Sequence, residues 1–331
     1  MEKSSAKVVL VTGGAGYIGS HCCKALAEHS FAPVTYDNLT TGNEEAVKWG
    51  PLIVGDIADR EKLLASFEQY QPVAVLHFAA SAYIGESVSD PAKYYRNNVG
   101  GIISLLDTCR DAKISKFVFS SSCATYGASG VVPVEETTPQ RPISPYGRTK
   151  LICENILQDY SEPFGLNYTA LRYFNAAGAD PEGEIGEWHS PETHLIPRAM
   201  LAASATGEAL EVFGTDYPTR DGTCIRDYIH VTDLAIANVL ALNYLLAGGS
   251  SLTVNLGTGK GHTTLDVLAA IERITGKRVP LLFKQRRAGD SPILIADAAL
   301  ARKELGFRPK YSELDNIVRT AAPFFGLTII A

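Results

Sequence analysis

Residues 7–19 have the sequence KVVLVTGGAGYIG, which indicates the fold class of the whole chain. Lys7–Thr12 is an apolar run without alternation, which is typical of a parallel strand buried on both faces. Three glycines follow it and lead into a helical pattern: Gly13, Gly16 and Gly19. Glycines at this spacing permit a tight turn, close approach of the backbone to a pyrophosphate, and close packing of helix on strand. The order of strand, turn and helix therefore predicts a dinucleotide-binding unit.

Outward from this segment, strand and helix patterns alternate as far as residue 175. Further strands are expected at 32–37, 52–54, 73–78, 116–120 and 168–172, and helices at 60–70, 91–112 and 145–160. This alternation predicts an α/β fold with a Rossmann-type, doubly wound parallel sheet. Beyond a loop at 176–191, helical patterns recur with short strands between them. We expect a dinucleotide-binding domain over 1–175 and a smaller mixed α/β substrate region over 176–331, some of whose segments return to the main sheet.

Composition and charge disfavour several classes of function. The formal net charge of −6 argues against a nucleic-acid partner, which would favour a basic surface. No apolar run is long enough to span a membrane, and the first residues lack the apolar region of a signal peptide. The six cysteines form no CxxC pair and the seven histidines show no ligand spacing. We therefore expect a cytoplasmic protein with reduced thiols and no metal site.

Two acidic positions bear on the choice of dinucleotide. Asp37 ends the second predicted strand, where a carboxylate can accept hydrogen bonds from both ribose hydroxyls and would repel a 2′-phosphate. This position favours NAD over NADP. Asp56 and Ile57 end the third predicted strand, and that dipeptide is as compatible with a loop cap as with a contact to adenine.

The segment Pro145–Lys150 contains the candidate catalytic groups. Pro145 suits the first position of a helix, and an i,i+4 spacing then places Tyr146 and Lys150 on one helical face. Lowering a tyrosine pKa from about 10 to about 7 requires about 4 kcal/mol, which a lysine ammonium and a positively charged nicotinamide ring can supply. Ser122 follows the strand at 116–120, at the sheet edge where open α/β folds bind ligands. In most helices a tyrosine and a lysine at this spacing are simply exposed surface residues. The prediction therefore rests on the position of this helix after the strand at 116–120, together with the glycine motif and Ser122.

Nine motifs between Lys7 and Arg308 together resemble a known family. They are TGGAGYIGSH (12–21), YDNLTTG (36–42), HFAASAYIGES (77–87), YYRNNVGG (94–101), SSSCATYG (120–127), SPYGRTK (144–150), LRYFNAAGA (171–179), FGTDYPTRDGTCIRDYIHVTDLA (213–235) and RRAGDSP (286–292). They resemble the extended short-chain dehydrogenase/reductase family, and within it the UDP-glucose 4-epimerase family. The resemblance implies an isomerase with NAD as cofactor and a UDP-sugar as substrate, assembled as a homodimer. Galactose metabolism is the expected context, and the supply of polysaccharide precursors stays open as an alternative.

The resemblance also implies a role for each matching position. Tyr146 would be the general base, Lys150 its helper and a contact to the nicotinamide ribose, and Ser122 a partner of the sugar's 4-oxygen. Besides the glycines, the implied NAD contacts are Tyr17, Ile18, Asp37, Asn38, Asp56, Ile57, Phe78, Ala79, Ala80, Asn97 and Tyr173. The implied UDP-sugar contacts besides Ser122 and Tyr146 are Asn175, His194, Leu195, Phe213, Arg226, Arg287, Asp290 and Leu294. Two of these are arginines, which can fork onto a diphosphate.

Two positions depart from the family pattern. Ala82 stands where some members carry a lysine near NAD, which removes one cofactor contact. Leu294 stands where the family often has tyrosine or a small residue beside the hexose. UDP-glucose/UDP-galactose is the expected pair, while UDP-GlcNAc/UDP-GalNAc and UDP-xylose/UDP-arabinose stay open as alternatives.

Other activities on the same scaffold are less compatible with the sequence. A 4,6-dehydratase or a sugar-acid decarboxylase needs an acidic residue just after the catalytic serine, where this chain has Cys123 and Ala124. A non-catalytic NAD-binding sensor would be free to lose the tyrosine or the lysine, and this chain retains both. The resemblance therefore implies C4 epimerisation through a transient 4-keto sugar.

Overall fold

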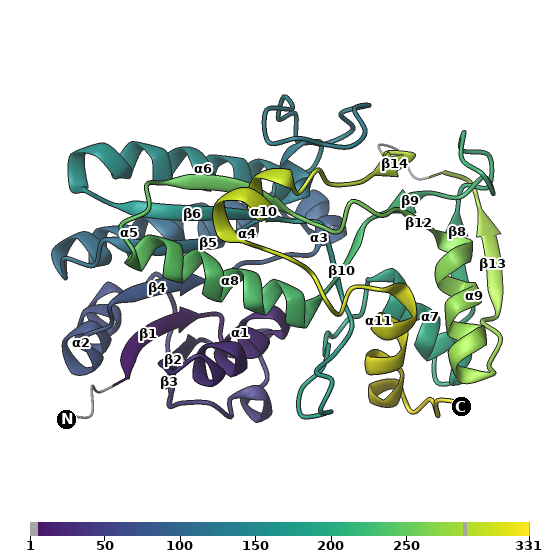
Figure 1. Cartoon of the computed structure of the whole chain (residues 1–331), viewed down its shortest axis with the longest axis horizontal. Helices are drawn as coiled ribbons and strands as arrows, with labels where there is room; N and C mark the ends of the chain where they lie inside the picture. The colour runs from purple at the N-terminus through teal and green to yellow at the C-terminus, as the bar shows by residue number, and fades with distance from the viewer. Residues whose placement is uncertain (1–5, 287–289, 331) are drawn as a thin grey trace. The chain divides into compact units, whose positions relative to one another are not determined.

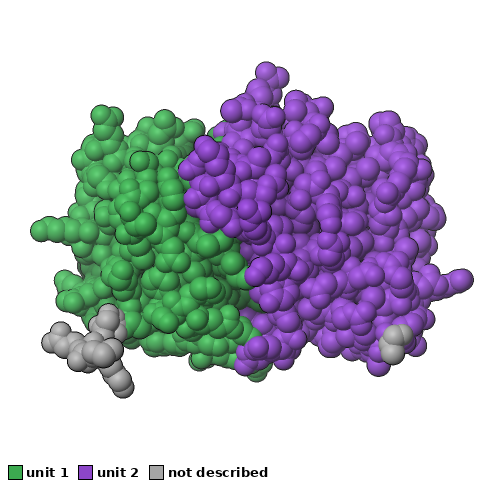
Figure 2. Space-filling model, viewed as in Figure 1, with its two compact units in different colours: residues 1–125, 142–172, 235–254 green, residues 126–141, 173–234, 255–331 purple. Residues whose placement is uncertain are grey.

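The computed structural model describes residues 6–286 and 290–330, and the chain divides into two compact units (Figure 2). Unit 1 comprises residues 1–125, 142–172 and 235–254, and unit 2 comprises residues 126–141, 173–234 and 255–331. Figure 1 labels the helices and strands in chain order. None of the helices in the described part of the chain combines the length and the hydropathy needed to cross a bilayer.

A seven-stranded sheet with the strand order β11-β6-β5-β4-β1-β2-β3 forms the centre of unit 1. Its strands are β1 (Lys7–Thr12), β2 (Phe31–Asp37), β3 (Leu52–Val54), β4 (Ala74–His77), β5 (Lys116–Ser122), β6 (Asn167–Tyr173) and β11 (Leu252–Leu256). The pairings from β3 through β2, β1 and β4 to β5 are parallel. The order reverses between β1 and β4, which is the switch point where such sheets bind ligands. The predicted Rossmann-type sheet is therefore confirmed.

Helices complete unit 1, and three of them cover one face of its sheet. The helical elements are α1 (Tyr17–Glu28), η1 (Glu44–Ala46), α2 (Arg60–Tyr70), α3 (Ile84–Ser89), α4 (Pro91–Tyr94), η2 (Tyr95–Gly100), α5 (Gly101–Asp111), η3 (Cys123–Thr125), α6 (Pro145–Phe164) and α8 (Val231–Leu246), the last of which begins in unit 2. Leu63 of α2, Leu105 of α5 and Leu157 of α6 share one buried cluster with Leu10 and Phe117 of the sheet. Burial on both sides explains why these strands show no alternation.

The predicted single helix at 91–112 is interrupted. Between α4 and α5 the segment η2 has the wider π-helical bonding pattern, which occurs often at functional sites. It carries Asn98, whose buried side-chain oxygen accepts a hydrogen bond from the Ser81 N–H at 2.8 Å. The Asn98 amide nitrogen donates to the Ser81 carbonyl and to the Thr149 hydroxyl of α6, at 3.0 Å each. Helical periodicity alone does not predict such a turn, because it depends on partners distant in sequence.

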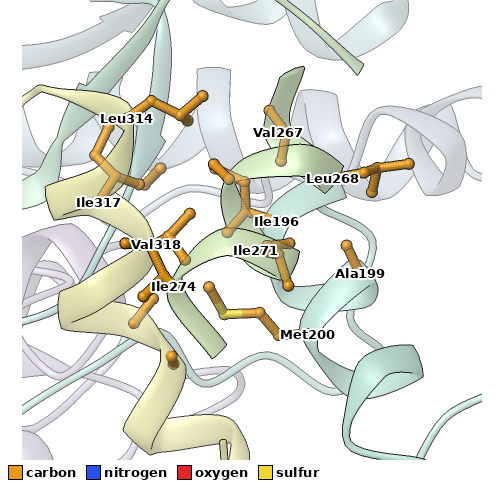
Figure 3. Packing of buried hydrophobic residues seen from close by; sticks show 14 of the residues in the cluster. Ile196, Ala199, Met200, Val267, Leu268, Ile271, Ile274, Leu314, Ile317 and Val318 are labelled. Atoms are coloured by element: carbon orange, nitrogen blue, oxygen red, sulfur yellow. The ribbon is translucent and has the colours of Figure 1, made fainter. Parts of the chain in front are cut away.

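Unit 2 contains several short strand pairs and a separate helical core. The strands are β7 (Asn175–Ala177), β8 (Leu210–Phe213), β9 (Ile225–Arg226), β10 (Tyr228–His230), β12 (His262–Thr263), β13 (Leu281–Lys284) and β14 (Ile293–Leu294). The helices are α7 (Leu195–Ala203), α9 (Thr264–Thr275), α10 (Ala299–Leu305), α11 (Leu314–Ala321) and η4 (Ala322–Phe325). Figure 3 shows that Ile196 and Met200 of α7, Ile271 of α9 and Val318 of α11 belong to one buried cluster.

Candidate active site

The glycine turn after β1 admits only glycine at two of its positions. Gly13 has φ +75°, and a Cβ there would lie 2.5 Å from the backbone nitrogen of Ala79, which follows β4. A Cβ on Gly19 would overlap the carbonyl of Gly13. Gly16 is the N-cap of α1 and offers no side-chain cap, so the first N–H groups of this helix are available to an anion. The turn thus has the shape and polarity that a pyrophosphate requires.

Asp37 is anchored beside this turn at the end of β2. Its carboxylate accepts hydrogen bonds from the backbone N–H of Ala15 at 3.0 Å and of Leu39 at 2.9 Å. Burial raises the pKa of Asp37, and these two N–H groups lower it in part. Each oxygen retains acceptor capacity for a further donor such as a ribose hydroxyl.

The Asp56 carboxylate has two hydrogen-bond donors within the chain. Its carboxylate accepts a hydrogen bond from the Asn38 amide at 2.8 Å and another from the Ala58 N–H at 2.8 Å. The second bond caps the loop, which is one of the two roles that the sequence allowed for this dipeptide. Ile57 is buried, and its side chain lies where any Cβ on Gly101 would overlap it. A contact of either residue with adenine stays a prediction.

Ser122, Tyr146 and Lys150 come together at the end of β5. The Ser144 hydroxyl caps α6 by accepting from the Gly147 N–H at 3.1 Å, and Pro145 occupies the first turn. Tyr146 forms a hydrogen bond with Ser122, and the Lys150 Nζ lies 5.9 Å from the centre of the Tyr146 ring. Lys150 Nζ donates to the Ser120 carbonyl at 2.6 Å, which holds the ammonium at the sheet edge. The arrangement therefore joins a phenol, a hydroxyl and a cation.

Burial shifts the pKa values of Tyr146 and Lys150, in opposite directions. It raises the pKa of Tyr146 to about 12, although the hydrogen bond with Ser122 lowers it in part. Burial also lowers the pKa of Lys150 to about 8, so the lysine is predominantly protonated at neutral pH. A tyrosine of this kind becomes a base near pH 7 only when additional positive charge lies beside it.

A buried ion pair supports the catalytic helix from behind. Glu154, one turn after Lys150, pairs with Arg172 of β6 through contacts of 2.7 and 3.0 Å, and it also accepts from Ser121 of β5. Both charged side chains are only 7% exposed. Because α6 is tied in this way to two strands, Tyr146 and Lys150 have a fixed orientation. Sequence spacing does not predict this pair, because Glu154 on α6 and Arg172 on β6 meet only when the helix packs on the sheet.

The other implied NAD residues lie on or next to elements of unit 1, and Tyr173 is the last residue of β6. Tyr17 and Ile18 form the first turn of α1, and Phe78, Ala79 and Ala80 follow β4. Asn97 lies on η2, where its amide donates to the Asn98 side chain at 2.9 Å. Tyr173 ends β6 and is assigned to unit 2, where it is buried.

Four of the implied UDP-sugar residues converge in unit 2. Arg226 on β9 donates to the Ser291 carbonyl at 2.8 Å and lies 3.7 Å from the Asp290 carboxylate. Leu294 on β14 is its direct partner across the parallel strand pair. The Asn175 amide of β7 donates to the Asp227 carbonyl, the next residue along from Arg226, at 2.8 Å.

The remaining implied substrate residues lie elsewhere in unit 2. Phe213 ends β8, and Leu195 begins α7. His194 precedes α7, and its imidazole pairs with Glu187 and Glu192. Arg287 lies outside the described residues.

Asp227 is a supporting residue that the sequence analysis did not identify. Its buried carboxylate accepts from the Thr258 hydroxyl at 2.6 Å and from the N–H groups of Thr258, Gly259 and Ala296. Four donor groups of the chain thus surround the Asp227 carboxylate, whereas Asp37 has the two N–H donors described above. Asp227 thus fixes the strand that carries Arg226, and the pattern RDY gives no signal of these partners.

Comparisons with known proteins agree over nearly the whole chain. Residues 9–257 match the family model described as "NAD dependent epimerase/dehydratase family". The UDP-glucose 4-epimerase of Rhizobium meliloti is 55% identical over 303 residues, which cover 92% of each chain. The crystal structure of UDP-glucose 4-epimerase from Brucella ovis in complex with NAD superposes with a TM-score of 0.97 at 60% identity, covering 98% of this chain and 100% of that one.

A further solved structure carries both a cofactor and a nucleotide sugar. It is the UDP-glucose-4-epimerase from Stenotrophomonas maltophila with bound NAD and formylated UDP-arabinopyranose. It is 41% identical, has a TM-score of 0.94, and covers 97% of this chain and 98% of that one.

Proposed function

This chain belongs to the NAD dependent epimerase/dehydratase family, and on that premise we propose that it inverts C4 of a UDP-sugar. The activity is that of an NAD-dependent isomerase, with UDP-glucose and UDP-galactose as the pair. The observation that carries the proposal is the contact of Tyr146 with Ser122 beside the Lys150 ammonium. The identities of 55% and 60% to UDP-glucose 4-epimerases support the same reaction.

The residues at the glycine turn fit NAD. The uncapped start of α1 suits its pyrophosphate, and the glycine at position 13 leaves the space that close approach requires. The Asp37 carboxylate suits the two ribose hydroxyls and disfavours a 2′-phosphate. When bound, NAD supplies a hydride acceptor and later the hydride donor, together with the positive charge that Tyr146 requires.

In this mechanism the side chains of unit 1 move a proton. The Tyr146 phenolate takes the proton of the sugar 4-hydroxyl as the C4 hydride leaves, and a 4-keto sugar results. Ser122 donates to the 4-oxygen, and the Lys150 ammonium stabilises the phenolate. When hydride returns to the opposite face of C4, Tyr146 gives the proton back, so the net reaction is inversion without a change of mass.

The residues of unit 2 anchor the nucleotide in this proposal. Arg226 supplies a guanidinium for the diphosphate, and Asn175 and Phe213 supply further contacts. The sugar must turn over while the nucleotide stays bound, so binding energy belongs on UDP rather than on the hexose. We infer that Leu294, which pairs with Arg226 across the strands, limits the size of the sugar.

Assembly and location are also part of the proposal. We expect a homodimer, as the resemblance implies, and the segment from α3 to α5 exposes the apolar side chains of Val88, Tyr95 and Ile103. We expect a cytoplasmic location, as the resemblance implies. Light scattering after gel filtration measures the first, and a mass of one chain would contradict it.

The test is a substrate panel on purified protein. UDP-glucose, UDP-GlcNAc and UDP-xylose are incubated separately, and the products are quantified by NMR and mass spectrometry. The proposal predicts conversion of UDP-glucose to UDP-galactose at constant mass, with nicotinamide extractable from the denatured protein. Loss of water or CO₂ would indicate the dehydratase or decarboxylase instead, and no turnover with added NAD would indicate a non-catalytic sensor.

A Leu294→Tyr variant tests what sets the size of the sugar. If Leu294 limits the pocket, the variant loses the N-acetylated substrate before UDP-glucose. An unchanged preference would remove Leu294 from that role while leaving the reaction type untouched.

A further inference from the structure

Four metal-ligating side chains converge in the loop that precedes α7. Glu187, His189, Glu192 and His194 each offer one ligand atom, and these atoms all lie within 4.8 Å of one another. The loop has no helix or strand of its own between them. All four belong to unit 2 and follow the pattern Glu-x-His-x-x-Glu-x-His. Spacing among the histidines alone does not reveal this group, because glutamates supply half of its ligand atoms.

The separations of these atoms are close to the edges of a tetrahedron around zinc, and the two to His194 are somewhat shorter. The His194 Nδ1 lies 2.9 Å from a Glu187 oxygen and 2.9 Å from a Glu192 oxygen. The His189 Nδ1 lies 3.2 Å and 3.5 Å from oxygens of the same two carboxylates. Bonds of about 2.0–2.2 Å to zinc separate tetrahedral ligands by about 3.3–3.6 Å. A small inward or outward adjustment therefore places all four atoms on one ion.

The carboxylates are held in place and largely shielded from water. The side chains of Glu187 and Glu192 are 4% and 9% exposed. The Glu192 carboxylate also accepts from the backbone N–H groups of Thr193 and His194, at 2.6 and 2.7 Å. Two shielded carboxylates require nearby positive charge, because an uncompensated buried charge is costly.

Either two protons or one divalent cation can supply that charge. With both imidazoles protonated, the charges of the four side chains sum to zero. Each Nδ1 then has a single proton to share between two carboxylates. With both imidazoles neutral, a 2+ ion gives the same zero sum and binds all four atoms. Metal binding would then release two protons, as is general for sites of this kind.

We propose that Glu187, His189, Glu192 and His194 form a structural zinc site. Two imidazole nitrogens and two carboxylate oxygens suit Zn²⁺, and four protein ligands fill a tetrahedral shell without an open position. The ion fixes the loop to the start of α7, because His194 immediately precedes that helix. Ile196 and Met200 of α7 lie in the core of unit 2, so the ion connects the loop to that core (Figure 3).

Metal analysis of untagged protein tests the site directly, because a polyhistidine tag would itself bind zinc. Protein purified without chelators is loaded with ZnSO₄, passed over gel filtration and analysed by inductively coupled plasma mass spectrometry. The proposal predicts one zinc per chain in the wild type and its loss in His189→Ala and in Glu192→Gln. The matched control is Glu182→Gln, in the purely acidic group Asp180, Glu182 and Glu184, which retains the zinc. A folded wild type with no stoichiometric zinc overturns the proposal, as does equal zinc in all variants.

Trp188 provides a second readout inside the loop. It lies between two of the ligands, is 68% exposed, and is one of only two tryptophans in the chain. In a Trp49→Phe background, stoichiometric Co²⁺ should quench the remaining tryptophan fluorescence and give the visible bands of tetrahedral cobalt, and Zn²⁺ should reverse both effects. Quenching that is absent, or unchanged by His189→Ala in that background, contradicts the site.

If the variants do not fold, the melting temperature of the wild type, measured with and without zinc, still tests the site. Zinc at about 100 times its dissociation constant should raise the melting temperature by about 4 °C over an EDTA-treated sample. No shift contradicts the proposal. These readouts do not depend on turnover of any UDP-sugar, so they are independent of the proposed reaction.

Discussion

Tyr146 of unit 1 lies on a helix of 20 residues, whereas Arg226 of unit 2 lies on a strand of two. The helical repeat alone brings Tyr146 and Lys150 together, and the end of a long strand adds Ser122. Arg226 instead takes its surroundings from Ser291 and Leu294, which are far along the chain. Residues that share a regular element can be placed from sequence spacing, and residues gathered from loops cannot.

Substitutions in the two units should also have different effects. The largest loss of activity is expected in unit 1. Tyr146→Phe keeps the ring and removes the group that moves the proton, so kcat should fall by about 10³-fold. The variant should still retain its nicotinamide, because the glycine turn and Asp37 are untouched. Turnover and extractable nicotinamide measure the two effects. A rate within a few-fold of the wild type would remove Tyr146 from the mechanism.

The buried pair behind the catalytic helix should give the second largest effect. Arg172→Met leaves the Glu154 carboxylate buried without its cation and should lower the free energy of unfolding by about 3 kcal/mol. The matched control is Arg278→Met in unit 2, whose pair with Glu272 is 87% and 49% exposed and should contribute less than about 1 kcal/mol. Urea unfolding measures both variants. Equal losses would show that burial of the pair does not control its contribution.

Arg226 should give a smaller effect of a different kind. Arg226→Lys removes the planar fork and keeps a charge, so KM for the UDP-sugar should rise by about 10–100-fold while kcat changes little. This result would separate anchoring in unit 2 from chemistry in unit 1. A fall in kcat with an unchanged KM would place Arg226 among the groups that stabilise the transition state.

The last effect concerns stability in acid and grows gradually, by about 1.4 kcal/mol for each pH unit. His77 is buried, and burial followed by the charge of Lys150 lowers its pKa to about 3, whereas an unfolded histidine titrates near 6.5. Between these values the unfolded chain binds a proton that the folded chain does not, so stability falls with decreasing pH by about 1.4 kcal/mol per pH unit. This contribution is complete above pH 6.5.

Replacement of His77 isolates that slope. His77→Gln should flatten the dependence of unfolding free energy on pH between about 4.5 and 6. His29→Gln, at an exposed position, serves as the control and should keep the wild-type slope. An unchanged slope in His77→Gln would assign the acid sensitivity to other groups.

These contrasts explain which features of the structure could be predicted from the sequence. The apolar strands, the glycine turn and the sheet were predictable because each follows from local pattern. The π turn that carries Asn98, the pair of Glu154 with Arg172 and the donors to Asp227 were not, since each depends on a partner distant in sequence. In the loop before α7 the four ligands are close in sequence, but histidine spacing alone does not indicate a site formed jointly with glutamates.

The fate of the hydrogen on C4 tests the central claim most directly. Wild-type protein is incubated with UDP-glucose that carries deuterium at C4, in ordinary water, and the UDP-galactose product is examined by NMR. If one hydride leaves C4 and returns to its other face, the deuterium remains fully at C4 of the product. Replacement of that deuterium by solvent hydrogen would contradict the account.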